Sequence, residues 1–90
     1  MQLVEILEKL DNTNKNELEN QIVSMGSSAL PVLVEQLQTS KGLKRGVVAM
    51  SLIRIGEESI SLLKDAASKN KDFSWIANYL IHEITNSAVA

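Results

Sequence analysis

The segment from Lys44 to Gly56 is a predicted helix that is apolar on two faces and ends at a glycine. One apolar set recurs at the spacing of a single helix face: Val48, Leu52 and Ile55. A second set lies on nearly the opposite face: Leu43, Val47 and Met50. A helix with two apolar faces must be covered on two sides. We therefore expect this helix at the centre of the fold, with Leu52 in the core.

Composition limits the fold and the chemistry. The 90 residues are 44% hydrophobic but only 3% aromatic, which favours one domain, residues 1–90, built from aliphatic helices. The absence of cysteine excludes disulfides, thiolate metal sites and a cysteine nucleophile. The first residues carry acids within their apolar run, unlike a signal peptide, and no apolar run is long enough to span a membrane. We expect a cytoplasmic protein without a membrane partner.

The net charge of −2 argues against nucleic acid as the main partner. The charges are nevertheless unevenly placed. Residues 1–35 hold six acids and two bases, whereas residues 36–75 hold seven bases and four acids. A solvated surface of mixed charge explains this, and so does a weak head-to-tail contact or an acidic partner for the basic half.

Apolar spacing and turn residues predict six helices at residues 2–11, 15–25, 29–38, 44–56, 58–68 and 73–85. Gly26 is expected to end the second helix in a left-handed conformation. Ser27 or Ser28 is expected to cap the third helix, with Pro31 in its first turn. Residues 86–90 are expected to fray.

The chain also repeats itself. A shift of 30 residues superimposes Gly26 on Gly56 and Ile22 on Leu52, and a shift of 29 superimposes Leu52 on Ile81. The first helix matches the third at a shift of 27. Amphipathic helices share apolar spacing by chance, but glycines and turns recurring in phase indicate three copies of one helical pair.

Residues 45–56, RGVVAMSLIRIG, resemble the second helix of a HEAT repeat in its short, phycobilisome-lyase HEAT-like form, Arg-x-x-Ala-Ala-x-Ala-Leu-x-x-Ile-Gly. Residues 26–37, GSSALPVLVEQL, resemble the first helix of such a repeat. At the position of Arg45 the first pair has Lys15 and the last has Ser74. The resemblance implies an all-α fold, an α-solenoid of three HEAT-like hairpins whose second helices line a concave face.

The resemblance further implies a non-enzymatic scaffold or adaptor that binds another protein through the concave face. The alternative that it implies is a bilin lyase-like or phycobilisome-handling subunit that acts with a partner chain. The family's repeat positions are structural, so no catalytic residue is transferred and no cofactor is expected.

The concave face can be named from the repeat shifts. On the fourth helix it comprises Val47, Met50 and Arg54, and on the sixth Ile76, Tyr79 and Glu83. On the second helix the matching positions are Glu17, Asn20 and Ser24. These residues form either an adaptable binding surface, with an Arg54–Glu83 pair across it, or packing between neighbouring helices.

Other residues leave alternatives open. Gly46 lies early inside a helix, where glycine costs stability relative to alanine. Either its missing side chain permits the close approach of a neighbouring helix or a ligand, or the glycine is a tolerated imperfection in the first turn. Trp75 and Tyr79 either anchor an interface or cap the end of the stack, and the apolar last pair is compatible with a weak homodimer. His82 is the only histidine, and we expect a structural or surface role rather than a metal site.

Overall fold

The computed structural model describes residues 2–89, with the side chains of residues 3–86. Within this range the chain is helical and contains no strand. The α-helices are α1 (Gln2–Glu8), α2 (Lys15–Ser24), α3 (Leu30–Thr39), α4 (Gly42–Ile55), α5 (Glu58–Lys69) and α6 (Ser74–Val89). Two short 3₁₀ helices, η1 (Gly26–Ala29) and η2 (Lys71–Phe73), precede α3 and α6. The prediction of an all-α chain with six helices is confirmed.

Most helix ends differ from the predicted ones by one or two residues, and α1, α3 and α6 show the differences that matter most. The helix α1 ends at Glu8 because the next two amides bond only three residues back, and the Asp11 carboxylate then accepts bonds from Thr13 and Asn14. These bonds hold the pKa of Asp11 below its ordinary value. The predicted serine cap of α3 is wrong, because η1 turns the Ser28 hydroxyl back to the Met25 carbonyl at 2.8 Å. The helix α6 continues to Val89, past the predicted fraying point.

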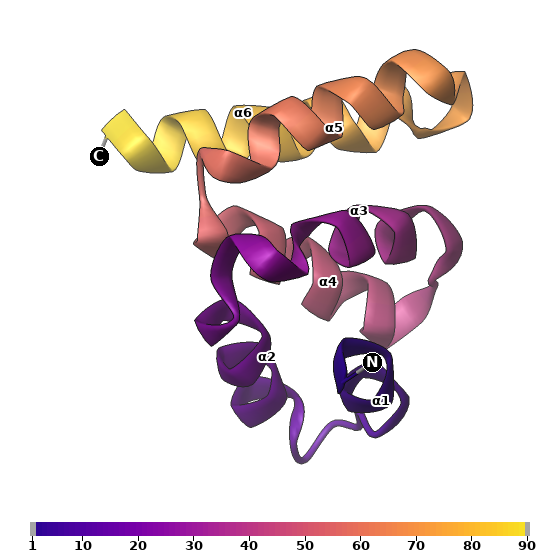
Figure 1. Cartoon of the computed structure of the whole chain (residues 1–90), viewed down its shortest axis with the longest axis vertical. Coiled ribbons are helices and arrows are strands. Elements are labelled where there is room, and N and C mark those ends of the chain that lie inside the picture. The colour runs from indigo at the N-terminus through magenta and orange to yellow at the C-terminus, as the bar shows by residue number, and fades with distance from the viewer. Residues whose placement is uncertain (1, 90) are drawn as a thin grey trace.

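The helices contact both their neighbours along the chain and helices two places away. Along the chain, α1 contacts α2, α3 contacts α4, α4 contacts α5 and α5 contacts α6. Two places away, α2 contacts α4, α4 contacts α6 and α3 contacts α5. Figure 1 shows the α5–α6 pair lying on the α3–α4 pair, with α1 and α2 at the other end. The extents of 32 × 29 × 22 Å and the radius of gyration of 12.3 Å describe a compact body, as about 12 Å is typical of a globular chain of this length.

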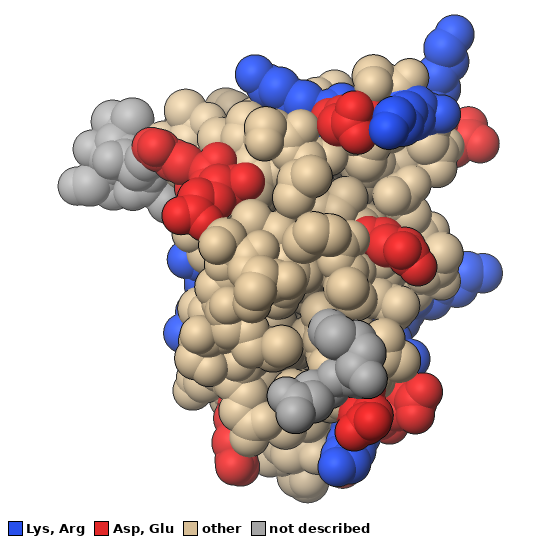
Figure 2. Space-filling view, in the orientation of Figure 1, with Lys and Arg blue, Asp and Glu red and all other residues tan. Residues whose placement is uncertain are grey.

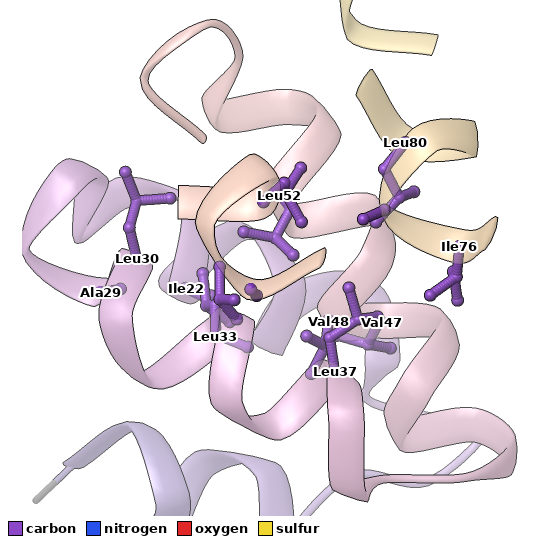
Figure 3. Packing of buried hydrophobic residues seen from close by; sticks show 14 of the residues in the cluster. Ile22, Ala29, Leu30, Leu33, Leu37, Val47, Val48, Leu52, Ile76 and Leu80 are labelled. Atoms are coloured by element: carbon purple, nitrogen blue, oxygen red, sulfur yellow. The ribbon is translucent and has the colours of Figure 1, made fainter. Parts of the chain in front are cut away.

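The helix α4 is the central element, as its two apolar faces predict. Val48 and Leu52 are fully buried, and Figure 3 shows Leu52 among the side chains that come together from α2, α3, α4 and α6. The repeat mate Ile22 on α2 is equally buried, whereas Ile81 on α6 is only partly covered. The buried core positions of α6 near Ile81 are instead Leu80 and Ile84.

A compact connection joins α4 to α5. Gly56 has φ +94°, which lets the chain leave α4 abruptly, and its N–H donates to the Leu52 carbonyl at 3.1 Å. The buried Ser59 hydroxyl donates to the same carbonyl at 2.9 Å. Both bonds satisfy the open C-terminal end of α4 and fix the last pair against the middle one.

We expect Leu52→Ala to lower the free energy of unfolding by about 2–5 kcal/mol, because it opens a cavity at the centre of the fully buried cluster. Leu43→Ala is the matched control in the same helix; Leu43 is 36% exposed, so its loss should cost under about 1 kcal/mol. Urea unfolding followed by circular dichroism gives both values. Equal losses for the two variants would contradict the central place assigned to Leu52.

Candidate binding surface

The sequence-predicted site residues fall into two groups. Met50 and Tyr79 are 47% and 57% exposed, Arg54 is exposed and Glu83 is half-buried. Val47 and Ile76 are only 4% and 8% exposed and belong to the core. For these two side chains the packing alternative therefore holds, and the accessible part of the predicted face consists of the remaining four.

Arg54 has a different partner from the predicted one. Its guanidinium donates to the Glu19 carboxylate and to the Asn20 side-chain oxygen, both at 2.8 Å, and thus joins α4 to α2. No Arg54–Glu83 ion pair occurs among the described side chains, so that predicted pair is wrong. The reason is that Arg54 lies on the side of α4 that packs against α2 rather than α6. Such an exposed pair orients both side chains but contributes only about 0–1 kcal/mol.

An open groove of about 420 Å³ runs between α2 and α4. Its α2 wall is polar and consists of Lys15, Asn16 and Glu19. Its α4 wall is mainly apolar and consists of Leu43, Gly46, Val47 and Met50. Two of the sequence-predicted site residues, Val47 and Met50, therefore meet here.

The repeat alignment missed the whole α2 wall. It selected Glu17, Asn20 and Ser24, none of which lines the groove, although Asn20 is bonded to Arg54. The helix α2 is rotated so that Lys15 and Glu19 face α4 instead. Besides Val47 and Met50, the unusual Gly46 was a signal in the sequence that marked this groove.

Gly46 does not serve the close packing of helices. A β-carbon built on Gly46 would meet no atom of another element within 4 Å, and the residue is exposed. Of the alternatives left open above, the close approach of a neighbouring helix is therefore wrong. The absence of a side chain at Gly46 instead leaves the groove between α2 and α4 wider.

The large exposed apolar side chains lie on two helices. Within the described residues these side chains are Leu43, Met50, Trp75 and Tyr79, two from α4 and two from α6. Trp75 is 65% exposed, and the Arg45 guanidinium lies over its ring at 5.8 Å from the ring centre. The Arg45 Nε is hidden from solvent and has no hydrogen-bond acceptor, and the ring lies within the distance of about 6 Å at which cation–π attraction acts.

A second groove, of about 390 Å³, lies between α3 and α5 on the odd-numbered helices. Its rim includes Glu35 and Gln38 from α3 and the Asp65–Lys69 ion pair from α5, at 3.1 Å. In the view of Figure 2 the charged side chains lie mainly towards the edges, and no continuous basic patch crosses that face. This groove lacks the exposed aromatic and methionine side chains that accompany α4 and α6.

The described residues offer no metal-binding cluster of three or more histidine, cysteine or acidic side chains. His82 instead contacts the Asn86 side chain one turn away, at 2.9 Å. None of the described helices is both long enough and apolar enough to cross a membrane.

Comparison of the chain with family models, with curated proteins and with solved structures finds no match in any of the three. The assignment of the surface therefore depends on its own geometry and chemistry.

We expect Gly46→Ala to raise the free energy of unfolding by up to about 1 kcal/mol, because it adds helix propensity where no neighbour is close. The control is Gly56→Ala, where φ +94° strains any other residue and about 1–3 kcal/mol should be lost. Thermal and urea unfolding measure both. A loss of stability for Gly46→Ala would contradict this expectation, because it would mean that a neighbouring group clashes with the added methyl group.

Proposed function

We propose that this chain is a non-enzymatic protein-binding module, a short α-solenoid of HEAT-like pairs whose even-numbered helices form the binding face. The order of contacts supports the solenoid: α2, α4 and α6 are successive neighbours, and α3 and α5 are neighbours on the other side. The second helices of the three predicted pairs thus form one layer, as the HEAT-like pattern implies.

The observation that carries the proposal is the segregation of exposed apolar side chains. Leu43, Met50, Trp75 and Tyr79 lie on α4 and α6, and the two on α4 line the groove that α4 forms with α2. Aromatic residues and methionine are enriched in the centres of protein interfaces, where their burial supplies most of the binding energy. Arg54, held by Glu19 and Asn20, supplies an oriented polar group at the rim.

The scaffold under this face is suited to the task. Val48 and Leu52 are fully buried beneath the exposed ridge, and Ser59 fixes the end of α4. A binding surface supported by a rigid helix loses little conformational freedom on association, which favours affinity. The exposed Met50 can still adapt to the shape of a partner because its side chain is flexible.

We expect the double variant Met50→Lys, Tyr79→Ala to lose the native partner while it keeps its helix content and melting temperature, because both side chains are largely exposed. Affinity purification from native extract with mass spectrometry identifies the partner, and calorimetry then measures a loss of at least about tenfold in affinity.

The matched control is Glu35→Ala, Gln38→Lys, which changes two exposed residues on α3. This control should bind as the unmodified protein does. Loss of the partner with the α3 variant, and retention with the α4–α6 variant, would place the binding face on the odd-numbered helices and contradict the proposal.

A further inference from the structure

The repeat alignment relates the contact between α4 and α6 to the groove between α2 and α4. Where α4 meets α6, Arg45 on α4 lies over the Trp75 ring on α6. The shift of 30 residues carries Lys15 onto Arg45, and the shift of 29 carries Gly46 onto Trp75. The groove between α2 and α4 therefore has the corresponding cation, on α2, but has a glycine at the position that corresponds to the ring.

The space left by that glycine is open. No atom of another element lies within 4 Å of the position that a Gly46 β-carbon would take, and the groove around it holds about 420 Å³. That volume lies within the range of small-ligand pockets, about 300–1,000 Å³. The apolar wall of Leu43, Val47 and Met50 matches the face of a ring, and the Met50 thioether adds a favourable sulfur–aromatic contact.

The charges around the groove indicate which charge a bound partner segment should carry. The Glu19 carboxylate is neutralised by Arg54 at 2.8 Å, whereas Lys15 makes no ion pair within the described part of the chain. Lys41 and Lys44 flank Leu43 at the same end of α4 as Gly46. The groove thus presents uncompensated positive charge on a chain of net charge −2, which favours an acidic segment over a basic one.

We propose that the groove between α2 and α4 binds a tryptophan or tyrosine side chain from an acidic segment of a partner protein. The ring occupies the position that corresponds to Trp75 at the contact between α4 and α6, and it lies over the Lys15 ammonium as Trp75 lies over Arg45. This inference rests on the proposed function, and it names the chemistry that the binding face recognises.

The test uses the full chain, labelled with ¹⁵N and with ¹³C-methyl methionine. The probe is a short acetylated peptide that carries one tryptophan between two glutamates. We expect shifts of the Gly46 and Val47 amides and of the Met50 methyl group on titration. A peptide with leucine in place of tryptophan, and one with lysines in place of the glutamates, should each bind at least about tenfold more weakly.

The variant Gly46→Trp supplies the ring from the chain itself and should abolish the peptide-induced shifts. Gln38→Trp, which adds the same ring at an exposed position on α3, is its control, and we expect it to bind the peptide within about twofold of the unmodified protein. Lys15→Gln should weaken binding about two- to fivefold through the lost cation–π contact. The peptide series and Lys15→Gln test the proposal even if Gly46→Trp does not fold.

Several outcomes would overturn the inference. They are equal binding of the leucine peptide, shifts confined to Glu35 and Asp65 in the groove between α3 and α5, and unchanged binding by folded Gly46→Trp. Concentration-dependent shifts of Gly46 and of the Trp75 indole without peptide would show that the occupant is a second copy of the chain. If Gly46→Trp keeps a native partner that the Met50–Tyr79 double variant loses, this inference fails while the proposed function stands.

Discussion

The burial of α4 between α2 and α6 is the constraint on which the rest of the structure depends. Its Val48 and Leu52 side chains are removed from water completely, and α3 covers the same helix from the other layer. One neighbouring helix cannot cover a helix that is apolar on two faces. Both α2 and α6 therefore pack against α4, and these contacts hold the two ends of the molecule together. The exposed side of α4, with Met50 and Gly46, consequently belongs to a helix whose opposite residues Val48 and Leu52 are fully buried.

The same arrangement explains where function can be placed. Only side chains on the free ridge of α4 and on its neighbour α6 combine large apolar area with exposure among the described residues. Met50 and Tyr79 are available for this reason, whereas Val47 and Ile76, three residues earlier in each helix, are buried in the core. The groove between α2 and α4 is open at Gly46, where a β-carbon would meet no neighbouring atom within 4 Å.

Helix number, the centrality of Leu52 and the stop at Gly56 could be predicted from apolar spacing and turn chemistry. The exact helix ends could not be predicted from the sequence. They depend on η1 and on the turn at Asp11, whose hydrogen bonds the spacing of apolar residues does not indicate. The site was predicted in part. The repeat shifts found Met50 and Tyr79 but chose Glu17 instead of Glu19, since the rotation of α2 is set by packing in three dimensions. The same rotation brings Arg54 to Glu19 rather than to Glu83.

The central claim is that a partner docks on the even-numbered helices, and photocrosslinking tests it most directly. A photoreactive phenylalanine analogue is placed at Met50 in one protein and at Gln38, on the rim of the groove between α3 and α5, in another. Both positions are exposed, so both proteins should fold. On irradiation in native extract, the account predicts a discrete crosslinked species from position 50 and none from position 38. A species from position 38 alone would contradict it.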